Sequence, residues 1–177
     1  CLEYGVPESD INVSYEEFAV ANRFDDADTI YIKRMLQHVL PEQLRSSIAE
    51  VLFNEFVGLS VEEFSSELYM SVNEVRELVN SGMCVGSHGS MHYWLDKMSP
   101  EEQEEDIKQS LNFLSSVGAS TADWVMCYPY GAYNDATLSL LERFDAALGI
   151  TTEARVANLT SDHSFKLPRL DTNDFPQ

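Results

Sequence analysis

The sequence predicts an α/β fold with parallel strands over residues 70–177, preceded by a helical segment over residues 1–69. Helix and strand signals alternate regularly from about residue 70, and helix-capping residues stand where each helix would begin. Polar motifs follow the strands at their carboxyl ends. Strand, helix and strand in this order favour parallel pairing with right-handed crossovers, as in an α/β barrel or an open sheet.

The first predicted helix of this region follows Ser71, which can form a capping box with Glu74. Gly82 is expected to end it, because glycine readily adopts the left-handed conformation found after helices. The apolar run 83–86 then predicts a strand.

A second capping box, Ser99 with Glu102, begins the next predicted helix, with Pro100 at its first position and Gly118 at its end. Residues 124–128 predict the second strand.

The turn Pro129-Tyr130-Gly131 ends that strand, and Asn134 is expected to cap another helix. Two further strands are predicted at residues 147–151 and 165–170.

Residues 1–69 predict helices around 15–21, 27–40 and 41–57, with Pro41 separating the last two. Two apolar stripes are expected to be packing faces, although they could instead bind a partner helix. They comprise Ile30, Met35, Leu36 and Val39, and Leu44, Ile48, Val51, Leu52 and Val57.

Charge and hydropathy exclude two classes of partner. Thirty acidic residues against 11 basic ones give a net charge of -19, which repels nucleic acid and anionic lipid. No apolar run approaches the roughly 20 residues of a membrane span. A neutral sugar or a cationic amine is compatible with this field, but an acidic surface that serves only solubility is the more common explanation.

The three cysteines, Cys1, Cys84 and Cys127, form no C-x-x-C pair and favour a reducing compartment. No secretory signal opens the chain, so a cytoplasmic location is the expectation.

His88 and His92 are the most informative residues, because two imidazoles four residues apart directly follow a predicted strand. If a helix begins there, both rings lie on one face and can share a divalent metal ion. The alternative is structural, with one ring stacked on Tyr93 or Trp94 and the other solvated.

Three polar motifs would share one face of the fold, since each follows a predicted strand. They are the histidine pair, the turn at Tyr130 and Gly131, and the carboxylates of Asp171 and Asp174. This coincidence favours a site.

From residue 68 to 177 the chain resembles the polysaccharide deacetylase (NodB-homology) family. The resemblance lies in the order and spacing of His88-Gly-Ser-Met-His92, Tyr128-Pro129-Tyr130-Gly131 and the stretch from Leu167 to Phe175, LPRLDTNDF. The helical first third is similar to an insertion found in some members. The resemblance implies a distorted (β/α) barrel whose first strands lie upstream of Cys1.

It also implies a metal-dependent hydrolase that removes N-acetyl or O-acetyl groups from a carbohydrate. His88 and His92 would hold the metal, commonly zinc, with cobalt or nickel as alternatives, and metal-bound water would attack the acetyl carbonyl. The Tyr130 backbone amide would stabilise the oxyanion. The Tyr130 and Trp94 rings would contact substrate.

Several departures from the family pattern bear on activity. Its Thr-Phe-Asp-Asp-Gly motif, which supplies the base and the third ligand, has no counterpart here; Phe24-Asp25-Asp26 is interpreted as a helix start. Cys127 replaces the family's Arg, and the final Leu-x-His is absent. His163 is considered as its substitute but is expected to be solvent-exposed, since it lies in a polar loop. Asp171 and Asp174 match the late acidic motif and are predicted to be catalytic, whereas His38 is predicted to be structural.

The expectation is therefore a deacetylase that is inactive as this chain alone. Two alternatives stay open: a non-catalytic glycan-binding or scaffolding relative, or a helical interaction module supported by the α/β part. The oligomeric state is left open by the sequence.

Overall fold

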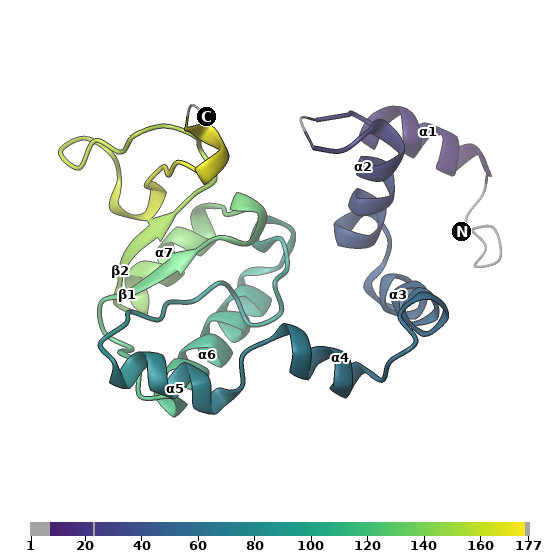
Figure 1. The fold of residues 1–177 in the computed structure, drawn as a ribbon. Helices are drawn as coiled ribbons and strands as arrows, with labels where there is room; N and C mark the ends of the chain where they lie inside the picture. The colour runs from purple at the N-terminus through teal and green to yellow at the C-terminus, as the bar shows by residue number, and fades with distance from the viewer. Residues whose placement is uncertain (1–7, 23, 176–177) are drawn as a thin grey trace. The chain divides into compact units, whose positions relative to one another are not determined.

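The computed structural model describes residues 8–22 and 24–175. The chain divides into two compact units, with the boundary along the sequence between Leu68 and Tyr69, and each is described by itself. Figure 1 shows helices throughout the first unit and a small sheet with helices in the second.

The first unit consists of helices. They are α1 (Glu8–Phe18), α2 (Ala27–Arg34) with a π-helical continuation (Met35–Val39), α3 (Glu42–Phe56) and α4 (Val61–Leu68). The break at Pro41 is confirmed, whereas α4 was not predicted.

Asp25 and Asp26 directly precede α2, and Asp26 is its N-cap. The Asp26 carboxylate accepts a hydrogen bond from the Thr29 amide at 2.8 Å, and Asp25 pairs with Lys33 at 2.7 Å. This hydrogen bond lowers the pKa of Asp26. The interpretation of residues 24–26 as a helix start is confirmed.

Only one of the two predicted apolar stripes is buried. Ile30 and Met35 are 7% and 6% exposed, and the His38 ring packs edge-on against Phe18. Val51 and Leu52, by contrast, are 53% and 39% exposed, so the prediction that the second stripe is a packing face is wrong for them. Periodicity identifies an apolar face but not whether anything covers it.

The second unit alternates helices and strands. It contains α5 (Val72–Asn80), α6 (Pro100–Ser116), β1 (Trp124–Cys127), α7 (Asp135–Arg143) and β2 (Ala146–Ile150). The capping boxes at Ser71 and Ser99 and the cap at Asn134 are confirmed.

The sheet has two strands, β1 and β2, which pair in parallel. Single bridges extend it on both sides, from Ser87 to Met126 and from Ile150 to Leu167. The predicted parallel order is therefore present, but a closed barrel is not found in the described residues.

The predicted strands at 83–86 and 165–170 are wrong as strands. Residues 83–86 form no strand; the bridge at Ser87 directly follows them, where the chain turns away toward the histidines. In the second, residues Ser164–Lys166 form a 3-10 turn, and Pro168, directly after the bridging Leu167, has no amide to donate.

The core of the second unit lies between this sheet and helices α6 and α7, which lie alongside it in Figure 1. Its buried side chains are Leu95, Ile107, Leu114, Trp124, Met126, Tyr128, Leu140 and Leu141. This core fixes the carboxyl end of β1. The loop of residues 88–94, which we call the histidine loop, lies beside this end, since His88 contacts the Cys127 carbonyl.

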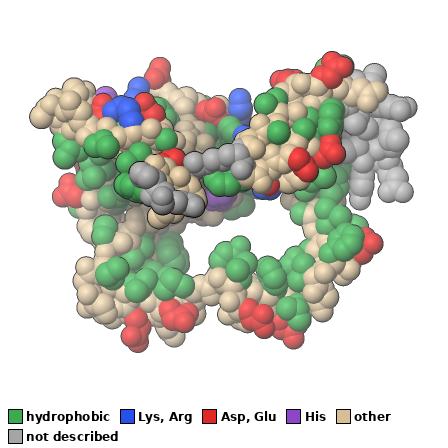
Figure 2. Space-filling view, turned by 45° about the horizontal axis from the view of Figure 1, so that its top comes forward, with side chains coloured by type: hydrophobic (Ala, Val, Ile, Leu, Met, Phe, Trp, Pro, Cys, Tyr) green, Lys and Arg blue, Asp and Glu red, His purple; other side chains and the backbone are tan. Residues whose placement is uncertain are grey.

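The described surface is acidic, and Figure 2 shows Asp and Glu side chains at several separate places on the face drawn. None of the described helices has the length and apolar character needed to cross a membrane.

Candidate active site

The two histidines meet at the end of the Ser87 bridge. The Nε2 atoms of His88 and His92 lie 3.1 Å apart, and the ring centroids 4.8 Å apart. Two nitrogen ligands of a tetrahedral zinc ion, each about 2.05 Å from it, would be about 3.3 Å apart. The pair therefore fits two positions of one metal ion.

The carbonyl of Cys127 orients the first ring. The His88 Nδ1 atom lies 2.6 Å from this oxygen, which can only accept, so Nδ1 carries the proton and donates. The Nε2 lone pair is thereby left to face His92. Metal-binding histidines commonly have such an outer hydrogen bond, which fixes the tautomer.

This contact uses the backbone of Cys127 and not its thiol. The Cys127 amide also donates to the Ser87 carbonyl at 2.9 Å, so the sheet bridge and the ring contact share one residue. The exchange of the family's Arg for Cys127 leaves this orientation of His88 intact.

The predicted helix between the histidines is wrong. Residues 88–94 form a turn without regular helix, and His92 adopts the left-handed conformation with φ of 56°. The pairing of the rings was expected from helical periodicity, but a tight loop produces it. A non-glycine residue with positive φ is strained and needs support from its surroundings.

Asp106 of α6 provides contacts to this loop that the sequence analysis missed. Its carboxylate accepts the Ser90 amide at 3.0 and 3.1 Å and the Met91 amide at 2.8 Å. Asp106 is 3% exposed. An acidic residue on the apolar side of a helix could have drawn attention, but its partner could not be read from the sequence.

The turn after β1 lies against the histidines. Tyr130 has φ of 58°, and its ring centroid lies 4.9 Å from that of His92. Gly131, with φ of 72°, leaves room for the loop after β2, because a Cβ atom there would lie 2.2 Å from Thr152 Oγ1. The predicted neighbourhood of Tyr130 and the histidines is therefore present.

Trp94 stacks on Tyr130, with centroids 5.0 Å apart and ring planes at 18°. Tyr130 is therefore a stacking partner of Trp94. Trp94, Tyr130 and His92 form a row of rings, which places two aromatic side chains at the histidine pair.

Asp171 and Asp174 shape their own turn near the end of the chain. The Asp171 carboxylate accepts the Asn173 amide at 2.8 Å, and Asp174 accepts the Asp171 amide at 2.8 Å. His163 is exposed, and its Nδ1 accepts the Phe165 amide at 3.1 Å. The catalytic assignment of Asp171 and Asp174 stays a prediction, whereas the expectation that His163 is solvent-exposed is confirmed.

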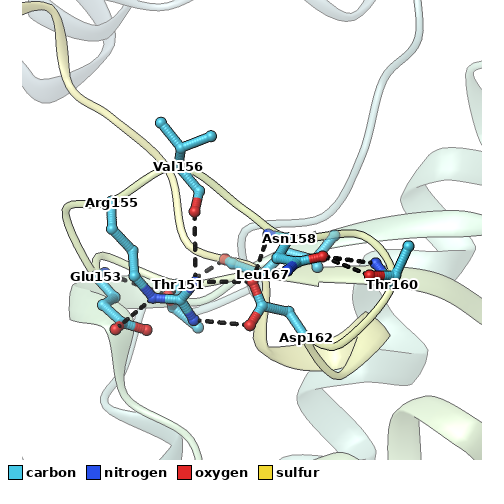
Figure 3. Close-up of polar contacts among 8 residues, drawn as sticks. All are labelled: Thr151, Glu153, Arg155, Val156, Asn158, Thr160, Asp162 and Leu167. Atoms are coloured by element: carbon cyan, nitrogen blue, oxygen red, sulfur yellow. Dashed lines mark hydrogen bonds and ion pairs between the residues drawn. The ribbon is translucent and has the colours of Figure 1, made fainter.

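An ion-pair cluster closes the loop after β2, as Figure 3 shows. Arg155 donates to both oxygens of Asp162 at 2.8 and 3.0 Å and to Glu153 at 2.7 Å. Asp162 also accepts the Asn158 amide at 2.7 Å. The hydrogen bonds from Arg155 lower the pKa of Asp162.

A cavity of about 330 Å³ lies beside His88, between the histidine loop and α6. Its lining includes Ser87, Ser110 and Phe113, and the Ser110 hydroxyl is buried without a hydrogen-bond partner.

The surroundings of His92 favour its neutral imidazole. Burial, followed by the charge of His88, lowers the pKa of His92. Neutral imidazole is the form that binds metal. Among the described residues, no group of three His, Cys, Asp or Glu side chains completes a metal site. The two histidines thus fit a metal as part of its ligand set.

A family model described as polysaccharide deacetylase matches residues 14–149. The chain belongs to the polysaccharide deacetylase family. The match includes the histidine pair and the Tyr130 turn, and it extends across most of the helical unit; the stretch with Asp171 and Asp174 lies outside it.

Two relatives show how much of a deacetylase this chain spans. YxkH of Bacillus subtilis (strain 168), assigned to the polysaccharide deacetylases, is 24% identical over 90 residues, or 51% of this chain and 32% of YxkH. The Streptococcus pyogenes deacetylase PplD, solved in complex with acetate, is 28% identical with a TM-score of 0.54, over 61% of this chain and 47% of PplD. The chain therefore spans about a third to a half of these relatives.

Proposed function

We propose that this chain carries two metal ligands of a carbohydrate deacetylase, which removes N-acetyl or O-acetyl groups from a sugar polymer. The observation that carries the proposal is the approach of the two Nε2 atoms to 3.1 Å, with His88 oriented by the Cys127 carbonyl. Family membership supports the reaction class.

A divalent ion at this pair, with zinc as the first choice, would polarise the acetyl carbonyl and activate water. The chain's own residues would do the rest. His88 and His92 bind as neutral ligands, and the Tyr130 amide, at the carboxyl end of β1, is proposed to donate to the developing oxyanion. The Tyr130 and Trp94 rings would position the sugar.

The general base and a third ligand are not assigned to any described residue. Asp171 and Asp174 remain candidates for proton transfer, because carboxylates perform this role in many hydrolases. With two imidazoles alone, we expect weak metal binding and little or no acetate release from this chain.

Metal content tests the proposal directly. The chain is dialysed to equilibrium against zinc in excess of the protein, and the zinc bound above the free concentration is measured by elemental analysis for wild type, His88→Ala, His92→Ala and His163→Ala. We expect bound zinc in the wild type and in His163→Ala, which loses an exposed histidine elsewhere, and none in the other two. Equal zinc in all four proteins would refute the site.

Acetate release from an acetylated chitooligosaccharide then tests the reaction. Any release should require added zinc and both histidines. Release that survives His88→Ala would show that another site performs it.

A second candidate is glycan binding without hydrolysis, which the stacked rings of Trp94 and Tyr130 favour, since flat aromatic faces suit the apolar faces of sugar rings. In that case Trp94→Ala should abolish binding of the same oligosaccharide, whereas His88→Ala should leave it unchanged and no acetate should appear with any protein.

A further inference from the structure

Buried Asp106 is unusual in having main-chain partners in place of a cation. It is 3% exposed, and no Lys or Arg pairs with it among the described residues. A buried carboxylate is costly unless strong donors surround it. The Ser90 and Met91 amides are those donors, so the histidine loop itself stabilises the charge.

The loop is shaped for this approach. Gly89 has φ of 74°, and a Cβ atom there would lie 3.1 Å from Asp106 Oδ2 and 3.3 Å from Pro129. The Gly89 amide in turn donates to Ser87 Oγ at 3.1 Å. A side chain at position 89 would therefore push the loop away from α6.

The helix that carries Asp106 is itself firmly held. Ile107, the next residue, is fully buried in the core. One turn earlier, Gln103 accepts a hydrogen bond from Thr137 of α7 at 2.7 Å and donates to the Met98 carbonyl at 3.1 Å. The carboxylate therefore sits on a rigid element.

The two rings differ in what fixes them. The His88 ring is held by its hydrogen bond to the Cys127 carbonyl. His92 has a positive φ, and its ring contacts those of His88 and Tyr130. The Met91 amide directly precedes His92 in the chain. Its hydrogen bond to Asp106 thus holds the main chain one residue before the second ring.

We infer that Asp106 is the positioning residue that holds the His92 imidazole against His88. It acts through the Ser90 and Met91 amides and does not itself touch a metal or substrate. The consequence for metal affinity rests on the proposed function, but the placement of the rings does not.

Asp106→Asn tests the inference with little change in shape. One carboxylate oxygen becomes an NH₂ group that faces the Ser90 amide, so two donors oppose each other. Glu101→Gln is the control, because it removes the same charge from an exposed position on the same helix. Gly89→Ala perturbs the same contact from the loop side and leaves α6 unchanged.

NMR of the metal-free chain gives the first result. In wild type and Glu101→Gln, we expect a nuclear Overhauser effect between the His88 and His92 rings and slow hydrogen exchange at the Ser90 and Met91 amides. In Asp106→Asn and Gly89→Ala, the ring signal should disappear and these amides should exchange at least about tenfold faster, while those of Leu114 and Met126 stay slow.

Zinc titration gives the second result. Loss of an outer-shell partner typically weakens metal binding about 10- to 100-fold, so we expect that range for Asp106→Asn and less than twofold for Glu101→Gln. An unchanged ring signal, or zinc binding within twofold of wild type, would overturn the inference. If the wild type binds no zinc, the proposed metal site fails, and the ring signal alone decides the role of Asp106.

Discussion

Two residues at the proposed site adopt a conformation that their side chains disfavour. His92 and Tyr130 have φ of 56° and 58°, and their rings lie 4.9 Å apart. Each such residue costs on the order of 1–3 kcal/mol, which the surrounding contacts must offset. Both strained residues belong to the proposed site, where the His92 ring and the Tyr130 amide must point in a defined direction.

Gly131→Ala should destabilise the protein. An alanine at position 131 would have a strained φ, and its methyl group would meet Thr152. We therefore expect a loss of about 2–4 kcal/mol in the free energy of unfolding, measured with urea. Gly118→Ala is the control, since it has a similar φ of 81° and no atom within 4 Å, and it should cost only about 1 kcal/mol. Equal losses would show that the Thr152 contact is unimportant.

His92 should titrate below the ordinary histidine value of 6.5 in the metal-free chain, because burial and then the charge of His88 disfavour its protonated form. The unfolded chain takes up this proton first, so the stability contributed by neutral His92 is complete above about pH 6.5 and falls as the pH drops below it. NMR titration of the ring measures the midpoint. His88→Ala should raise it part of the way toward 6.5; no change on this substitution would contradict the contribution of His88.

At the scale of elements, the loop after β2 depends on one guanidinium. Arg155 holds Asp162 with two nitrogens and Glu153 with a third, as Figure 3 shows. Because Thr152 in this loop contacts Gly131, the order of the loop bears on the Tyr130 turn.

Arg155→Lys should loosen this loop, because an ammonium group cannot form the same paired contacts. Hydrogen exchange at the Asn158 amide, which donates to Asp162, should become faster than in wild type. Arg169→Lys, at another exposed arginine of this unit, is the control and should leave that amide unchanged.

The loop should also open in acid. Since hydrogen bonds lower the pKa of Asp162, its contribution is present above the unfolded value of about 3.9 and is lost as the pH falls through the lower folded value. Asn158 exchange that shows no such pH dependence, after correction for the intrinsic rate, would contradict this assignment.

At the scale of the whole molecule, residues 69–177 hold a core of their own, since every side chain of the main buried cluster belongs to them. We therefore expect a protein of residues 69–177 to unfold cooperatively in urea, with the His88 and His92 ring contact preserved. The full chain is the comparison. A gradual transition without a midpoint would show that the helical unit stabilises the core.

The sequence by itself determined the features that depend on neighbours along the chain. Ser71, Ser99 and Asn134 cap helices because their partners lie three residues away, and such contacts need no tertiary structure. The family motifs around His88 and Tyr130 likewise identified the polysaccharide deacetylase family and the candidate metal ligands.

Only the tertiary structure decided how the site is built. The helix expected between the histidines is a loop, because the Ser90 and Met91 amides bond to Asp106, 16 and 15 residues away respectively, instead of continuing a helix. The strand expected at 83–86 is absent and that at 165–170 is reduced to a single bridge, since a strand exists only where a partner pairs with it. Contacts between distant segments leave no periodic signal, so neither Asp106 nor the Cys127 carbonyl could be found from spacing.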